Sequence, residues 1–202
     1  MSERSPAFSR LCEAALLHFA RNGYEGASLS TIADALGIRK ASLYSHVKSK
    51  DELYLLLFSD AVAAEEDFAL SCFAEREERA LPGEAYLNKL EHRYQTSLYM
   101  QLLLKAAYFP PAQHRAQIVE NFTRFYDKLR ASFLEDFQRS EFSVSNAEKR
   151  DLYAESWLGI VDSLCVELLY GSPERTNLRK AAMTMLLSDA LHKEQMRSQG
   201  AC

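Results

Sequence analysis

Four basic residues lie within the short segment from Gly37 to Leu53, GIRKASLYSHVKSKDEL, in a chain of net charge −4. Small residues and a tyrosine stand between the two basic pairs. Lysine and arginine donate to phosphate oxygens and guanine edges, and small side chains let a helix approach the bases closely. Residues 1–50 carry seven basic and four acidic side chains, so their net charge is +3 and the remainder carries −7. This asymmetry predicts that only the N-terminal part meets a nucleic acid.

Helices must position this segment, because apolar residues recur with the 3.6-residue period along almost the whole chain. Only 7 glycines and 5 prolines interrupt the pattern, which favours an all-α protein over one rich in strands and turns. The hydrophobic content of 48% and charged content of 26% are typical of a globular chain. We predict about nine helices and no strand, at about residues 6–22, 28–36, 39–47, 49–73, 84–96, 98–108, 114–140, 146–170 and 173–193.

The first three of these helices are short, and the second and third have the pattern of a helix-turn-helix. Gly37 stands at the turn, where the backbone can need a positive φ. Ala33 is small, as the close crossing of two helices requires. The residues predicted to fix the angle between the two helices by core contacts are Ile38, Leu43 and Val47.

A projection of the third helix at 100° per residue separates a structural face from a binding face. Leu43 and Val47 face inward. The opposite face presents Ala41, Tyr44, Ser45 and Lys48, with Lys40 and Ser42 on its flanks. Lys40 is suited to guanine O6 or N7, Ala41 or Ser42 to a thymine methyl, and Tyr44 and Lys48 to phosphates.

Two helix starts carry further information. Arg39 and Lys40 open the third helix, where positive charge opposes the helix dipole by roughly 0.3–1 kcal/mol, so binding explains this pair better than stability does. At the next helix, Ser49 and Glu52 fit a capping box in which each side chain accepts from the other residue's backbone N–H. Thr31 and Lys50, near the starts of the second and fourth helices, offer anion contacts.

Over about residues 10–53 the sequence resembles the DNA-binding domain of the TetR family of bacterial transcriptional regulators. The resemblance is carried by Ala15, Phe19, Gly23, Ile32, Ala33, Leu36, Gly37, Ile38, Leu43, Tyr44, His46, Lys50 and Leu53. It implies DNA contacts by Lys40, Ala41, Ser42, Tyr44, His46 and Lys50. The complete set of predicted DNA-binding residues is Ser28, Thr31, Arg39, Lys40, Ala41, Ser42, Tyr44, Ser45, His46, Lys48 and Lys50.

The resemblance also implies two domains, a helix-turn-helix domain over residues 1–50 and a helical effector-binding and dimerisation domain over residues 51–202. It implies a homodimer formed by the last two helices, a palindromic double-stranded DNA operator, and a cytoplasmic repressor released by a small-molecule effector. Aromatic and polarisable residues of the second domain are candidates for the effector site. They are Tyr94, Tyr99, Met100, Lys105, Tyr108, Phe122, Tyr126, Trp157 and Cys165.

Two alternatives share this fold: a redox sensor that uses Cys72 or Cys165, and a regulator without an effector. The four cysteines (the others are Cys12 and Cys202) lie far apart without a C-x-x-C pair, so we predict free thiols and no metal site. The sequence lacks the motifs of metalloproteases, nucleophile-elbow hydrolases and phosphate-binding loops, so we predict no enzyme and no cofactor. Without an apolar leader or a spanning segment, we expect a soluble protein with no membrane partner.

Overall fold

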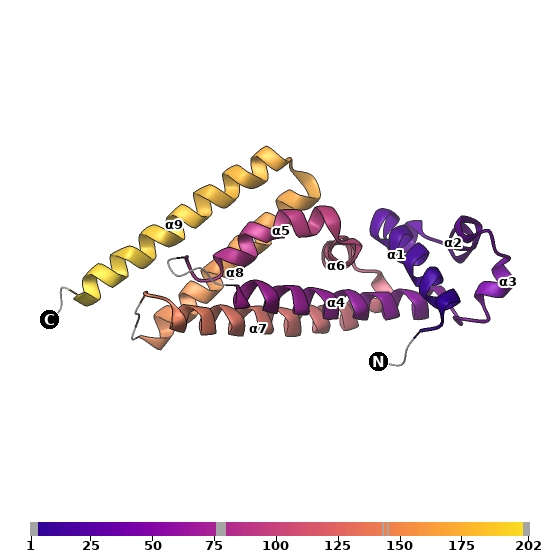
Figure 1. The fold of residues 1–202 in the computed structure, drawn as a ribbon, viewed down its shortest axis with the longest axis horizontal. Helices are drawn as coiled ribbons and strands as arrows, with labels where there is room; N and C mark the ends of the chain where they lie inside the picture. The colour runs from indigo at the N-terminus through magenta and orange to yellow at the C-terminus, as the bar shows by residue number, and fades with distance from the viewer. Residues whose placement is uncertain (1–3, 76–79, 143, 145, 200–202) are drawn as a thin grey trace. The chain divides into compact units, whose positions relative to one another are not determined.

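The computed structural model describes residues 4–75, 80–142, 144 and 146–199. Within these ranges the chain forms nine α-helices, one 3-10 helix and no strand (Figure 1), which confirms the all-α prediction. The elements are α1 (Pro6–Gly26), α2 (Leu29–Leu36), α3 (Lys40–Leu43), α4 (Lys50–Ala74), α5 (Glu84–Thr96), α6 (Leu98–Tyr108), η1 (Ala112–His114), α7 (Arg115–Arg139), α8 (Ala147–Tyr170) and α9 (Pro173–Gln199). No helix in the described ranges combines the length and apolarity that crossing a membrane would need.

The helices belong to two compact units, and each unit takes two segments of the chain. Unit 1 comprises residues 1–65 and 96–122, and unit 2 comprises residues 66–95 and 123–202. Helices α4 and α7 therefore contribute to both units. This division differs from the predicted domain boundary at residue 50, because α6 packs against α1 and joins the N-terminal helices in one unit. The domain boundary stays a prediction.

The core of unit 1 contains residues from α1, α2 and α4. Phe19, Ile32 and Leu53 are completely buried there. Helix α1 begins as predicted, with the Ser5 hydroxyl accepting from the Phe8 N–H at 3.3 Å. Gly23 has the positive φ (70°) expected at the end of this helix, but the helical segment resumes after it and continues to Gly26. The predicted end of the first helix is thus an internal kink.

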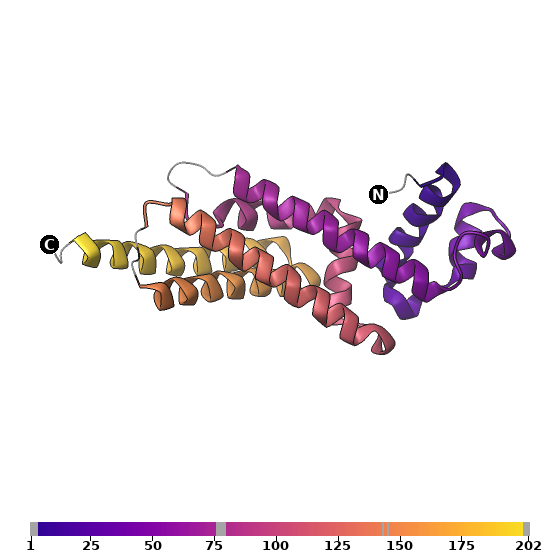
Figure 2. The ribbon, with the colours of Figure 1, turned by 90° about the horizontal axis from the view of Figure 1, so that it is seen from below.

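Unit 2 is organised around Trp157 on α8, whose side chain is completely buried. Its ring stacks on Phe133 and packs at a tilt against Phe73 and Tyr86, and its Nε1–H donates to the carbonyl oxygen of Gly83 at 3.3 Å. Helices α8 and α9 pack along one another (Figure 2). The Trp157 indole of α8 thus lies directly against Gly83, in the loop before α5.

Candidate nucleic-acid interface

Helix α2 is held at both ends by local hydrogen bonds. The Ser28 hydroxyl accepts from the Thr31 N–H at 3.1 Å, and the Thr31 hydroxyl oxygen accepts from the Ser28 N–H at 3.2 Å. This reciprocal capping satisfies two backbone donors that the helix itself leaves unpaired. Gly37 ends the helix in the left-handed conformation (φ 66°, ψ 26°), as predicted from its place in the turn. Ser28 and Thr31, both predicted DNA contacts, thus have a structural role in capping.

The third helix is shorter than predicted. Helix α3 covers only Lys40–Leu43, and residues 44–46 continue as turns in place of the predicted helix over residues 39–47. Arg39 supplies no side-chain cap, and Lys40 places a positive charge in the first turn. The Ser45 hydroxyl donates to the carbonyl oxygen of Ser42 at 2.7 Å, a local bond of the kind that competes with helical structure. These features explain why the helix ends early.

The packing of this turn agrees with the predicted faces at two positions and disagrees at one. Leu43 and Val47 are buried, as the helical projection predicts. Ile38 is 37% exposed, so its prediction as a core contact is wrong. Ile38 directly follows the left-handed Gly37, where the chain leaves α2 and has not yet entered α3. Burial of Leu43 and Val47 anchors the segment.

The recognition segment, residues 39–48, presents a continuous run of exposed side chains around that anchor. Tyr44 is 49% exposed, which is unusual for a large aromatic residue that serves only the core. The exposed members of the predicted DNA-binding set are Thr31, Arg39, Lys40, Ala41, Ser42, Tyr44, Ser45, His46 and Lys48. Small and cationic side chains thus lie together on a surface that buried residues hold in place.

Lys50 has a different environment from the other basic residues of this segment. Its ammonium lies 3.8 Å from the centre of the Tyr24 ring and donates to the carbonyl oxygens of Tyr24 at 2.8 Å and Ala27 at 3.2 Å. These carbonyls belong to the end of α1, where helical acceptors lack partners. The contacts favour a structural role, in which Lys50 ties the start of α4 to α1. Its predicted DNA contact stays a prediction.

The start of α4 is also held by a carboxylate cluster that sequence reasoning did not find. The Tyr24 hydroxyl donates to Asp51 Oδ1 at 2.9 Å, and His114 Nε2 contacts the same oxygen. These hydrogen bonds lower the pKa of the Asp51 carboxyl, and the bond from Tyr24 is the stronger cause.

The predicted capping box at the start of α4 forms only in part. The Ser49 hydroxyl accepts from the Glu52 N–H at 3.1 Å, but the Glu52 carboxylate accepts from the N–H of Lys48.

Arg4 and Phe8, near the N-terminus, make two contacts that no sequence pattern indicated. The Arg4 guanidinium forms a bidentate ion pair with Asp60 of α4 at 2.7 and 2.8 Å and lies 5.8 Å from the Phe8 ring centre. The Phe8 ring stacks on His46, a predicted DNA contact, with centroids 6.0 Å apart. Helix α1 therefore helps to orient the end of the recognition segment.

The sequence of this region matches a known family of regulatory proteins. Residues 11–57 match the model of the family described as bacterial regulatory proteins, tetR family. A TetR-family transcriptional regulator from Agrobacterium tumefaciens has a similar fold, with 18% identity, a TM-score of 0.68, and coverage of 90% of this chain and 95% of that one. Residues 11–57 are therefore a tetR-family segment. The proteins matched here are bacterial regulatory proteins.

Two further comparisons connect this chain with a regulator of fatty acid metabolism and with a regulator solved together with a ligand and DNA. It is 24% identical over 134 residues to the fatty acid metabolism regulator protein of Bacillus subtilis (strain 168), covering 64% of this chain and 69% of that protein. It also resembles the crystal structure of AibR in complex with isovaleryl coenzyme A and operator DNA. That match has 21% identity, a TM-score of 0.60 and coverage of 87% of this chain and 95% of that one.

The nine predicted effector-binding residues are divided between the two units. Unit 1 contains Tyr99, Met100, Lys105, Tyr108 and Phe122, and unit 2 contains Tyr94, Tyr126, Trp157 and Cys165. Trp157, Cys165 and Met100 are buried and pack as core residues. The hydroxyl of Tyr126 donates to Asp162 on α8. Lys105 lines a pocket in unit 1. Effector binding by the nine stays a prediction.

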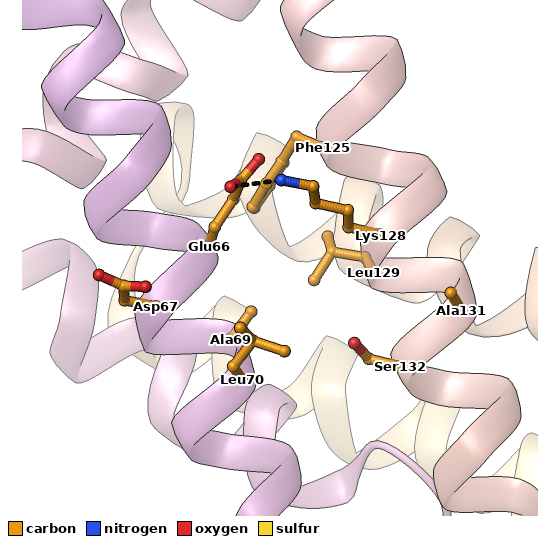
Figure 3. Close-up of a pocket in the computed structure, with 9 residues that line it drawn as sticks. All are labelled: Glu66, Asp67, Ala69, Leu70, Phe125, Lys128, Leu129, Ala131 and Ser132. Atoms are coloured by element: carbon orange, nitrogen blue, oxygen red, sulfur yellow. Dashed lines mark hydrogen bonds and ion pairs between the residues drawn. The ribbon is translucent and has the colours of Figure 1, made fainter.

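A second pocket lies between α4 and α7 in unit 2 and has a volume of about 240 Å³ (Figure 3). Glu66 and Lys128 form an ion pair of 2.6 Å across it, and Phe125 and Leu129 supply apolar walls. Sequence analysis assigned none of these residues to a site. In the sequence, charged residues such as Glu66 and Lys128 are typical of solvated helix faces, and only the pairing of α4 with α7 brings them together.

Proposed function

We propose that the protein is a cytoplasmic, homodimeric repressor that binds a palindromic operator and is released by a small-molecule effector. The observation that carries the proposal is the recognition segment, where exposed cationic and small side chains surround the buried Leu43 and Val47. A fixed helix-turn-helix with such a surface can place Lys40 and Ala41 against base edges and Tyr44 and Lys48 against phosphates. In this proposal residues 1–50 bind DNA and residues 51–202 dimerise and bind the effector.

The homodimer is supported by the apolar surface of the last two helices. Seven large apolar side chains of α8 and α9 are at least 37% exposed, and six of them are at least 58% exposed. They are Leu152, Val166, Tyr170, Leu178, Met185, Leu186 and Met196. A concentration of exposed apolar side chains is typical of an interface. A two-fold dimer suits DNA recognition, because two helix-turn-helix units about 34–36 Å apart reach successive major grooves of a palindrome.

Release by an effector requires a difference in affinity between two conformers. A ligand that binds both conformers equally shifts nothing, and each tenfold preference supplies about 1.4 kcal/mol of switching free energy. The relatives named for fatty acid metabolism and for isovaleryl coenzyme A support organic acids and their thioesters as the first effectors to test. If none of them, and no other ligand, changed operator affinity, the alternative of a regulator without an effector would replace this part of the proposal.

The redox-sensor alternative is disfavoured by the cysteines. Cys12, Cys72 and Cys165 are buried, and burial raises the pKa of each thiol, to about 12 for Cys165. A thiol reacts with peroxide as the thiolate, which burial suppresses. Cys202 lies outside the described residues. We expect hydrogen peroxide to leave operator affinity unchanged. If peroxide instead released the DNA, and Cys165→Ser or Cys72→Ser abolished that release, the redox-sensor alternative would be established.

The DNA-binding surface is tested by substitution of two exposed residues. An operator selected from a random DNA pool is labelled, and binding is measured by fluorescence anisotropy over a range of salt concentrations. The double variant Tyr44→Ala, Lys48→Ala should lose operator binding while keeping its helical circular dichroism and its oligomeric state, because both side chains are exposed. Wild-type affinity in a folded double variant would show that another surface binds DNA.

A further inference from the structure

A pocket of about 220 Å³ lies within unit 1, where the end of α1 meets α4 and α6. Its walls are largely aromatic and aliphatic, with Tyr24, Tyr54, Leu102 and Phe109 among the lining residues. Lys105 of α6 supplies the cationic group. An apolar slot with a few converging polar groups is the usual form of a small-molecule site.

The Lys105 ammonium is only partly satisfied by the protein. It donates to the carbonyl oxygen of Arg21 and forms no ion pair with a carboxylate of the described residues. An ammonium has three N–H donors, so two are left for solvent or a ligand. Partial burial of the ammonium lowers the pKa of Lys105. An anion in the pocket would compensate for this loss of solvation.

Tyr54 also lines the pocket, and its hydroxyl lacks a partner among the described residues. The residue is only 2% exposed, and its hydroxyl makes no hydrogen bond to any described residue. Every fully enclosed side-chain nitrogen or oxygen in the described ranges has a partner, so the Tyr54 hydroxyl must reach open space. The pocket is the open space that Tyr54 lines. A buried hydroxyl gains free energy when an acceptor is supplied to it.

We propose that this pocket binds a small monocarboxylate with a single apolar ring, its carboxylate held between the Lys105 ammonium and the Tyr54 hydroxyl. A carboxylate only accepts hydrogen bonds, which matches two donors. An apolar cavity of about 150 Å³ holds benzene, so about 220 Å³ accommodates a ring with a carboxylate attached. The proposal names an effector class and a site for the proposed function, and it rests on that function only for its regulatory consequence.

The chemical class is tested with three ligands of matched shape in the absence of DNA. Phenylacetate, 2-phenylethanol and 2-phenylethylammonium are titrated into the full-length wild-type protein by isothermal calorimetry. We expect saturable one-site binding of phenylacetate, at least tenfold tighter than that of the alcohol, and no measurable binding of the ammonium compound. Equal affinities for the acid and the alcohol, or no binding of phenylacetate, would overturn the proposal.

Three variants locate the site. Lys105→Met keeps the length of the side chain but removes its charge, and should weaken phenylacetate binding about 10- to 100-fold. Tyr54→Phe removes only the hydroxyl and should weaken binding about 3- to 10-fold. Lys128→Met, in the α4–α7 pocket of unit 2, is the matched control and should bind as the wild type does. Unchanged affinity in a folded Lys105→Met or Tyr54→Phe protein would refute the site.

Operator binding by the ligand-free wild type is measured separately. Phenylacetate binding without any operator binding would contradict the proposed function and leave the pocket intact. Operator binding without phenylacetate binding would contradict the pocket and leave the proposed function intact.

Discussion

The two lysines on either side of Ser49 should respond to substitution in opposite ways. Lys48 is exposed and its ammonium has no hydrogen-bond or ion-pair partner in the described protein, whereas the Lys50 ammonium contacts the Tyr24 ring and two carbonyl oxygens at the end of α1. The perturbation is replacement of each lysine by methionine, which keeps most of the aliphatic stem and removes the charge. Sequence alone predicts the same DNA-contacting role for both.

The expected loss of stability follows from these contacts. A hydrogen bond to a charged group contributes about 1.5–3 kcal/mol, and a cation–π contact contributes about 0.5–2 kcal/mol. Removing the ammonium also removes its cost of partial desolvation, so the terms do not add. We expect Lys50→Met to lower the free energy of unfolding by about 2 kcal/mol, roughly a 30-fold change in the folded-to-unfolded ratio. Lys48→Met should change it by less than about 0.5 kcal/mol.

The assays are urea unfolding followed by circular dichroism, and operator binding as a function of salt. Each phosphate that a lysine neutralises contributes about 0.9 to the slope of log K against log salt. A dimer carrying Lys48→Met should therefore lose about 1.8 from the slope, while Lys50→Met should leave the slope unchanged. A Lys50→Met protein of wild-type stability with a reduced salt slope would refute the reasoning, because Lys50 would then leave Tyr24 to bind phosphate.

Further substitutions test the packing of unit 2 and the pH dependence of unit 1. A Cβ on Gly83 would lie 2.3 Å from Trp157 Nε1 at a φ of +71°, so Gly83→Ala should cost about 3 kcal/mol in urea unfolding. The lowered pKa of Asp51 means that its contribution to stability is present above the unfolded value of about 3.9 and is lost as the pH falls through the lower folded value. Asp51→Asn should therefore destabilise the protein at pH 7, and the difference in stability between mutant and wild type should shrink as the pH falls below about 3.9; a difference that stays equal from pH 7 into acid would contradict this account.

Sequence determined the helices well where local physical chemistry decides them. Ser28 and Gly37 bound α2 as predicted, because a hydroxyl cap and a left-handed glycine act within one turn of the chain. Local rules were less successful where weak preferences compete. The recognition helix ends at Leu43 since nothing caps its start, and α1 passes through the kink at Gly23.

Tertiary structure decided the roles of residues whose partners lie far along the chain. The sequence identified the recognition segment and its buried anchor, because the 3.6-residue period separates the two faces without knowledge of any distant contact. It could not show that Lys50 contacts Tyr24 or that His114 contacts Asp51, which lies 63 positions away. It could not separate Trp157, a core residue, from Lys105, which lines a pocket. Burial and the partners of a charge depend on which helices pack together, and that arrangement is a property of the folded chain.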